Sequence, residues 1–195
     1  KSHLAAILNI SPDHLERHGS IRNYIKAKFK LIKTQTKKDF TFLNTNNLFI
    51  KRYLSGQRIL SKIIKINKTV QSKVLKKIDN SNFLSDGNKE NLSFVFEIAK
   101  KMKISKNNLF KVLQKFNGLD FRQQVIFKSK NLIIINDSKA TSFSSTVSIL
   151  RSITNVYWIV GGQAKKGDKF LLNKSECKNM EAYIFGKNKK FFINK

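Results

Sequence analysis

The sequence predicts an α/β protein of two domains whose sheets are mainly parallel. Short β-branched apolar runs, such as residues 132–135, alternate with segments of helical periodicity over the last third of the chain. This alternation is typical of parallel strands joined by crossover helices. Asn117–Asp120 (NGLD) interrupts the pattern and predicts a boundary between residues 1–118 and residues 119–195. A chain of 195 residues is long enough for two small cores.

The first domain is expected to open with a buried strand over residues 4–10, followed by a turn at Ser11–Asp13. Ser20 is a suitable N-cap for a helix that runs to about Lys33, since apolar residues fall on one face of it. The other predicted elements of this domain are a short strand and two helices, at residues 40–44, 88–102 and 105–116. Residues 46–83 are rich in lysine and predict no clear element.

The second domain is expected to continue as strand, strand, helix, strand, helix and strand. The five elements that can be placed lie at residues 123–128, 131–136, 144–153, 156–162 and 181–185, the second of them a buried strand. In parallel sheets, ligands bind outside the carboxyl ends of the strands. The loops 136–142 (NDSKATS) and 161–170 (GGQAKKGDKF) are therefore expected to lie side by side at a site. Ser142 can cap the helix that follows it, and the start of that helix favours an anion.

The chain carries 39 Lys and Arg residues against 12 Asp and Glu, a net charge of +27. Such a charge favours an anionic partner, either nucleic acid, a phosphorylated ligand or an anionic membrane surface. The lysines are nevertheless spread over the whole chain, as an A+T-rich coding sequence would make them. A basic nucleic-acid-binding α/β module therefore stays as an alternative function.

Cysteine usage and hydropathy predict a cytoplasmic protein. Cys177 is the single cysteine, which excludes an internal disulfide framework and is typical of a reducing compartment. The sequence contains no run of about 18 apolar residues and no leader with a cleavage site, so no membrane partner is expected. Apolar runs stand within a few residues of both ends, and we expect the chain to be part of a longer protein.

The loop after the first strand gathers four potential metal ligands, Asp13, His14, Glu16 and His18. Their spacing allows a hard-cation or phosphate-linked site, a zinc site or an ordinary surface loop. A zinc-protease motif needs Glu directly after the first His, and Leu15 stands there. Lys28, on the apolar face of the next helix, must pair, lose its proton, be modified or extend its ammonium group to solvent.

The sequence signals for phosphate binding are weaker than those for metal binding. Asp137 and Lys139 follow a strand and precede a helix, where they could line an anion site or form a solvated pair. Gly161 and Gly162 allow close approach of a ligand to the backbone. A double glycine after a strand is nevertheless a common pattern and indicates no particular ligand. The sequence contains no G-x-x-x-x-G-K-[ST] loop, so the chain by itself is not expected to hold a nucleoside triphosphate tightly.

Taken in order, three segments resemble the Mur ligases of bacterial cell-wall synthesis, and among them the ligases that add D-glutamate. The segments are AILNISPDHLERHGSIRNYIKAKFKL, FNGLDFRQQV and INDSKATS. The resemblance covers the whole chain, from within the family's central ATPase domain (1–118) into part of its Rossmann-like C-terminal domain (119–195). The family's phosphate loop and UDP-binding domain would precede residue 1. The sequence departs from the family pattern at Gly87 and Phe121, where the family usually has histidine.

The resemblance implies roles for nine residues. His14 would bind Mg²⁺, and Lys28 would be the family's carbamylated lysine, whose anion ligates Mg²⁺. The residues that match the family's nucleotide contacts are Asn88, Asn91, Arg122 and Asp137. The residues that match its acyl-phosphate and D-glutamate contacts are Lys139, Thr141 and Lys165. The two asparagines would lie near the adenine, the arginine and the aspartate near the phosphates and ribose, and Lys139, like His14 and Lys28, would be catalytic.

The reaction implied by the resemblance is ATP-dependent amide bond formation with Mg²⁺. ATP would phosphorylate the alanyl carboxylate of UDP-N-acetylmuramoyl-L-alanine, and the amine of D-glutamate would attack the acyl phosphate. The full-length enzyme would be a monomer, the chain alone would be inactive, and nucleic acid would not be a partner. Another ligase of the same superfamily, which includes the folylpolyglutamate synthetases, is the second alternative.

Overall fold

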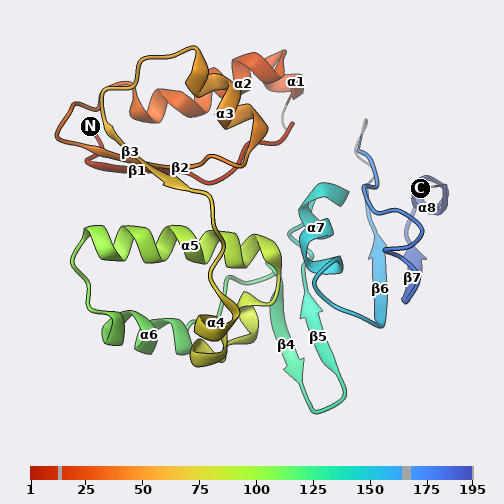
Figure 1. Cartoon of the computed structure of the whole chain (residues 1–195). Helices are drawn as coiled ribbons and strands as arrows, with labels where there is room; N and C mark the ends of the chain where they lie inside the picture. The colour runs from red at the N-terminus through yellow and green to blue at the C-terminus, as the bar shows by residue number, and fades with distance from the viewer. Residues whose placement is uncertain (13–14, 164–167, 195) are drawn as a thin grey trace. The chain divides into compact units, whose positions relative to one another are not determined.

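The structure of this chain, a computed structural model, describes residues 1–12, 15–163 and 168–194. Its internal contacts divide it into two compact units (Figure 1). Unit 1 comprises residues 1–70 and 90–105, and unit 2 comprises residues 71–89 and 106–195. This division differs from the predicted boundary after residue 118, which stays a prediction about the domains of the family.

Unit 1 is built on a parallel three-stranded sheet in the order β1-β2-β3. Its strands are β1 (Leu4–Ile7), β2 (Phe40–Asn44) and β3 (Lys62–Ile66), and its helices are α1 (Leu15–His18), α2 (Ile21–Phe29), α3 (Leu48–Ser55) and most of α5 (Asp86–Lys101). The predicted strands at 4–10 and 40–44 are therefore confirmed, the first in shorter form. The lysine-rich stretch that predicted no element supplies α3, β3 and, outside this unit, α4 (Ser72–Ile78).

The two faces of this sheet are covered by different helices, since α2 and α3 pack on one face and α5 on the other (Figure 1). Successive strand residues point to opposite faces. In β2, Leu43 accordingly joins a buried cluster with Phe29 and Ile50, whereas Phe42 joins a second cluster with Phe94. Ser20 caps α2 as predicted, because its hydroxyl accepts the Asn23 N–H at 3.2 Å, and a short 3₁₀ turn, η1 (Lys30–Ile32), follows the helix.

A buried carboxylate holds the loop before β2 against the start of the chain. The Asp39 side chain has no solvent exposure and accepts hydrogen bonds from the Thr36 N–H at 2.6 Å and the Thr36 hydroxyl at 2.9 Å. His3 Nδ1 lies 2.8 Å from Asp39 Oδ1, and Lys1 Nζ lies 3.1 Å from Oδ2. The Thr36 N–H, together with His3 and Lys1, holds the pKa of Asp39 well below its usual value of 3.8 although burial opposes this shift.

We expect this carboxylate to stabilise the chain above pH 3.8 and to lose that effect as the pH falls below it. The folded-state pKa of Asp39 is lowered, so in acid the Asp39 side chain takes up a proton in the unfolded chain but stays ionised in the folded chain. Folding therefore becomes less favourable as the pH falls. Asp39→Ala should lower the thermal midpoint at pH 7 by several degrees and flatten its acid dependence. Asp120→Asn, at an exposed carboxylate, is the control, and an unchanged midpoint in Asp39→Ala would contradict the expectation.

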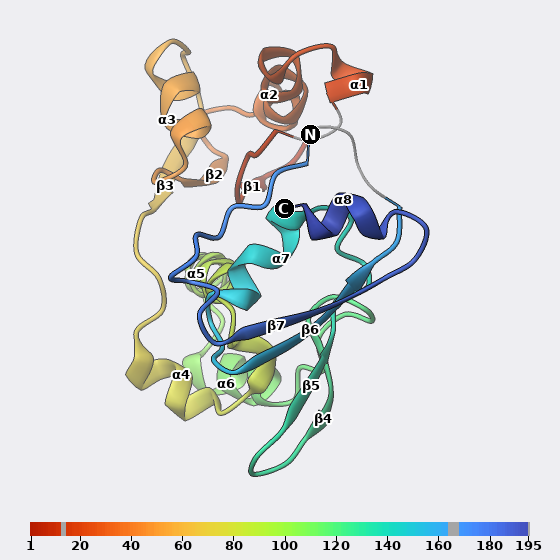
Figure 2. The same cartoon turned by 90° about the vertical axis from the view of Figure 1, so that its right-hand side faces the viewer.

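Unit 2 holds two separate strand pairs rather than one sheet. Its strands are β4 (Gln124–Lys128), β5 (Ile133–Asn136), β6 (Val156–Gly161) and β7 (Met180–Phe185). Its helices are α4 (Ser72–Ile78), η2 (Ser81–Phe83), the first turn of α5, α6 (Lys106–Gln114), α7 (Phe143–Leu150) and α8 (Lys189–Ile193). The β6–β7 pair is parallel as predicted, and α7 packs on one side of it through Val147 and Leu150 against Trp158 (Figure 2).

Strands β4 and β5 pair antiparallel, because the four residues that connect them are too few for a parallel crossover. Two predictions for unit 2 are wrong. The strand over residues 131–136 is not buried, since Ile133 is 40% and Ile134 42% exposed. Residues 168–179 contain turns instead of the predicted helix: Asn173 and Glu176 form the reciprocal hydrogen bonds of a capping box, but only turns follow before β7 begins at Met180. The α/β class with mainly parallel sheets is confirmed by β1–β3 and β6–β7.

Candidate functional site

The predicted metal-binding residues belong to unit 1. His14, with Asp13, lies outside the described residues. Lys28 is exposed on α2, with its Nζ 5.0 Å from the centre of the Tyr24 ring one turn earlier. Of the alternatives open to Lys28, the structure shows the extension to solvent, because Phe29 and the apolar residues near it fill the core and the long lysine stem reaches solvent along Tyr24.

The donor chemistry of Lys28 decides whether it suits Mg²⁺. An ammonium group repels a cation, whereas a carbamate offers the oxygen ligands that Mg²⁺ prefers. An exposed amine can react with dissolved CO₂, so the position of Lys28 fits a carbamate. Over residues 1–12, 15–163 and 168–194, no group of three or more His, Cys, Asp or Glu side chains could hold a metal ion without such a change.

Unit 2 joins two of the predicted nucleotide residues, Asn88 and Asp137, through one hydrogen-bond network. The Gln123 N–H donates to Asp137 Oδ1 at 3.1 Å, and the Ser85 hydroxyl donates to Gln123 Oε1 at 2.5 Å. Ser85 Oγ in turn accepts the N–H of Asn88 at 3.2 Å. The network thus links the start of α5 to the end of β5, with Arg122 adjacent in the chain to Gln123.

The carboxylate of Asp137 is incompletely satisfied. Its Oδ2 atom is buried and, among the described residues, has no hydrogen-bond partner. Burial raises the pKa of Asp137 above 3.8, while the Gln123 N–H and the positive charge of Arg122 act in the opposite direction. Because buried polar atoms nearly always have a partner, this oxygen is suited to accept a hydrogen bond from a ligand.

The backbone on both sides of Arg122 has an unusual conformation. Phe121 has φ of 61° and Gln123 has φ of 49°, in the left-handed region that side chains other than glycine rarely adopt. The turn is held because the Phe121 carbonyl accepts the Lys139 N–H at 3.0 Å and the Gln123 N–H is bonded to Asp137. Such strained positions are common at functional sites. Here they place the charge of Arg122 near Asp137.

One hydrogen bond connects the ends of the two loops that were predicted to lie side by side. The Phe143 N–H, at the first position of α7, donates to Asp168 Oδ2 at 2.8 Å, which joins the end of loop 136–142 to the segment after β6. Ser142 stands at the N-cap position as predicted, but its hydroxyl bonds to Ser144 and Ser145 and caps no backbone N–H. An internal carboxylate therefore occupies the anion-favouring start of α7.

The remaining predicted residues have less defined surroundings. Lys139 and Thr141 are exposed on loop 136–142, and Lys165 lies outside the described residues. Asn88 donates through Nδ2 to the Asn82 carbonyl at 2.7 Å, so one of its amide hydrogens is already used. Asn91 is exposed one helical turn further along α5.

Sequence reasoning missed Ser85, Gln123 and Asp168. Each is a common polar residue without a motif of its own, and each acts on a residue at least 14 positions away. The only available signal was their closeness in the chain to suspected residues, since Gln123 follows Arg122 and Ser85 precedes Asn88 by three positions. Short-range patterns do not reveal such long-range pairs.

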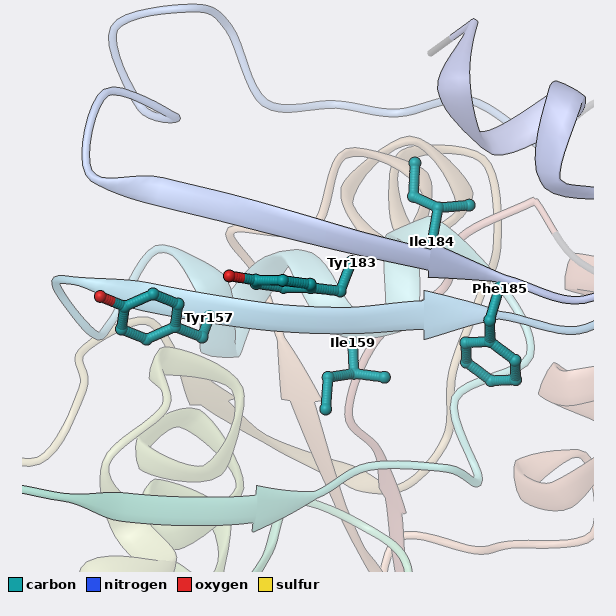
Figure 3. Close-up of a pocket in the computed structure, with 5 residues that line it drawn as sticks. All are labelled: Tyr157, Ile159, Tyr183, Ile184 and Phe185. Carbon is teal, nitrogen blue, oxygen red and sulfur yellow. The ribbon is translucent and has the colours of Figure 1, made fainter.

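A hollow of about 510 Å³ lies on the face of the β6–β7 pair, with side chains from both strands around it (Figure 3). Its lining is mostly apolar and consists of Tyr157, Ile159, Tyr183, Ile184 and Phe185. None of the predicted site residues is in that lining. The hydrogen-bond network around Asp137, and not this hollow, therefore defines the candidate site.

Comparison with known proteins places these features in a family. A model of the Mur ligase middle domain matches residues 1–115. The UDP-N-acetylmuramoylalanine–D-glutamate ligase of Rickettsia felis is 29% identical to this chain, with 97% of this chain and 46% of the relative covered. The ligase of the same name from Francisella tularensis subsp. novicida is 33% identical, with 96% and 44% covered. The chain thus spans less than half the length of these relatives.

Solved structures agree on the fold. MurF from Acinetobacter baumannii has a TM-score of 0.62 at 14% identity, with 98% of this chain and 53% of that chain covered. The MurF ligase from Thermotoga maritima, solved in complex with ADP, has a TM-score of 0.67 at 12% identity, with 98% and 50% covered. Since the middle-domain model matches more than half of the sequence and these structures share its fold, the chain belongs to the Mur ligase family.

Proposed function

We propose that this chain forms part of an ATP-dependent ligase that adds D-glutamate to UDP-N-acetylmuramoyl-L-alanine through an acyl phosphate. The observation that carries the proposal is the buried, unpartnered Oδ2 of Asp137, which shares a hydrogen-bond network with Asn88 and feels the charge of Arg122. A ribose hydroxyl is a suitable donor for that oxygen, and the guanidinium of Arg122 is suited to the nucleotide phosphates.

Two further residues on the same loop are suited to the transferred phosphoryl group. Lys139 and Thr141 follow Asp137 by two and four positions and are exposed. An ammonium and a hydroxyl there can stabilise the negative charge of the acyl phosphate and of the tetrahedral intermediate formed when the amine attacks. Lys165, in the segment after β6, is proposed to bind the D-glutamate carboxylate.

Mg²⁺ would be held by His14 and by Lys28 as its carbamate, and it would neutralise part of the phosphate charge. Asn88 and Asn91 are proposed to lie near the adenine. We place the reaction in the cytoplasm and expect the working enzyme to be a monomer.

The relatives support this choice of substrates. The curated relatives that we compare carry the name of the D-glutamate ligase, and one neighbour in structure was solved with ADP. The segment INDSKATS favours a D-glutamate ligase over other members of the superfamily. Because the chain spans less than half of these relatives, the activity proposed is that of the ligase that contains this chain.

Release of phosphate tests the proposal. The purified ligase that contains this chain should release phosphate from ATP when UDP-N-acetylmuramoyl-L-alanine and D-glutamate are both supplied, and omission of either should stop the reaction. L-Glutamate and other amino acids at the same concentration are the controls. Equal or faster reaction with another amino acid would reject D-glutamate as the substrate. A coding sequence without a Gly-Lys-Ser/Thr phosphate loop upstream of Lys1 would count against the ligase itself.

A further inference from the structure

We infer that Asp168 is a positioning residue that fixes the α7 end of loop 136–142 and thereby sets the positions of Lys139 and Thr141. The inference rests on the proposed function, because it assigns those two side chains to the acyl phosphate. Asp168 lies 25 positions after the residue that it binds, and no resemblance or motif in the sequence assigns it a role.

The contact itself is a hydrogen bond to a charged acceptor. Asp168 Oδ2 accepts the Phe143 N–H at 2.8 Å, and this N–H is one of the four at the start of α7 that lack a partner within the helix. Ser142, at the N-cap position, directs its hydroxyl to the side chains of Ser144 and Ser145. Asp168 therefore satisfies the N–H of the first helical position from another part of the chain, and its charge suits the positive end of the helix dipole.

The packing around Phe143 makes this contact rigid. The Phe143 ring is buried, with its centre 5.4 Å from that of Phe170 and 6.2 Å from that of Trp158. Phe170, two residues after Asp168, also stacks on Trp158 at 5.9 Å. The backbone of Phe143 is thus held by the carboxylate of Asp168, and its side chain is held by aromatic rings. Asp168 and Phe170 come from the segment after β6, and Trp158 comes from β6 itself.

Loop 136–142 is consequently fixed at both ends by different partners. At the β5 end, Asp137 accepts the Gln123 N–H and the Lys139 N–H donates to the Phe121 carbonyl. At the α7 end, Asp168 holds Phe143, which is two residues after Thr141. Losing the second anchor should therefore disturb Thr141 and Lys139, while the Ser85–Gln123–Asp137 network keeps the nucleotide residues in place.

This asymmetry predicts a separation of kinetic constants in the ligase that contains this chain. Asp168→Ala should lower kcat about 10- to 100-fold while the KM for ATP stays within about twofold, since small displacements of reacting groups cost rate. Asp168→Asn keeps an oxygen acceptor for the Phe143 N–H and should retain kcat within about threefold. Glu176→Ala is the matched control, because it removes the 2.7 Å hydrogen bond to Arg151 at the opposite end of α7 and should leave kcat unchanged.

A second measurement does not depend on catalysis. In the 195-residue chain, hydrogen exchange of the Phe143 amide should speed up about 3- to 10-fold in Asp168→Ala and remain near the original rate in Asp168→Asn. Wild-type kcat in Asp168→Ala, or an Asp168→Asn variant as defective as Asp168→Ala, would overturn the inference. An unaltered rate of hydrogen exchange at the Phe143 amide in Asp168→Ala would overturn it as well. This measurement still decides if the alanine variant is too unstable for kinetics.

The two proposals fail separately. If the unaltered enzyme does not ligate D-glutamate, the proposed function is rejected, and the role of Asp168 in that reaction is rejected with it, while Phe143 exchange still decides whether Asp168 anchors the loop. If ligation occurs and kcat in Asp168→Ala is that of the unaltered enzyme, only the positioning role is rejected.

Discussion

Lys28→Ala in the ligase that contains this chain is expected to reduce ligation about 10²- to 10³-fold, a loss comparable to that of a group that stabilises charge in the transition state. Lys28 is exposed, so its neutral amine can attack CO₂, form the N–C bond of a carbamate and release a proton to water. The product is an anion where the unmodified side chain carries a positive charge. Alanine has no amine, so added bicarbonate should not restore activity.

Lys26→Ala is the matched control, because Lys26 is also an exposed lysine near the end of α2. It should retain activity within about twofold, as expected for a solvated surface charge. Carbon NMR of enzyme equilibrated with ¹³C-labelled bicarbonate should show a carbamate signal that disappears in Lys28→Ala and persists in Lys26→Ala. Full activity of Lys28→Ala would reject both the carbamate and the metal-binding role.

In the ligase that contains this chain, Asp137→Asn is expected to weaken nucleotide binding about 10- to 100-fold, because a hydrogen bond to a charged acceptor contributes about 1.5–3 kcal/mol. Asparagine can still accept the Gln123 N–H through Oδ1, but it places an amide nitrogen where Oδ2 lies. Calorimetric titration with ADP would measure the change. Asp120→Asn, at an exposed carboxylate, should bind ADP like the unaltered protein, and equal affinity in Asp137→Asn would contradict the assignment.

The same substitution should make the nucleotide-free chain more stable at neutral pH. Burial raises the folded-state pKa of Asp137, so the folded chain keeps a proton that the unfolded chain has released. Stability is therefore lost as the pH rises from 3.8 through the raised pKa, and the charged form remains unfavourable above it. Thermal midpoints from pH 3 to 7 should show this decline in the unaltered chain and a smaller one in Asp137→Asn. A lower midpoint for Asp137→Asn at pH 7 would contradict the expectation.

Local elements of the fold could be predicted where their signals are local. The Ser20 cap, the strand over residues 40–44 and the helices near residues 88–102 and 105–116 were predicted from residue type and periodicity, and all are confirmed within a few residues. Each depends on hydrogen bonds or side-chain packing between residues close in the chain. The elements of the lysine-rich stretch could not be predicted, for the opposite reason. Ile64 and Ile66 of β3 become core residues only through pairing with β2, which is distant in the chain.

The same limit of local signals applies at the candidate site. Lys28 falls at the edge of an apolar helix face, and periodicity cannot tell whether its ammonium group turns inward or extends past Tyr24 to solvent. Ser142 was correctly placed at the start of α7, but its hydroxyl bonds to the side chains of Ser144 and Ser145 and caps no backbone N–H. The Phe143 N–H is taken instead by Asp168, 25 positions away, and such a choice of partner depends on geometry that the sequence does not contain.

The sequence by itself determined the chemistry available to this protein: an α/β chain whose strands end in a polar loop with Asp137, Lys139 and Thr141, and a resemblance strong enough to name a family. Only the tertiary structure decided which side chains act together. Ser85, Gln123 and Asp137 are brought into one network, and Asp168 reaches Phe143, across separations of 14 to 38 residues. Such contacts form only after the intervening chain has folded and closed its loops, so no short stretch of sequence can encode them alone.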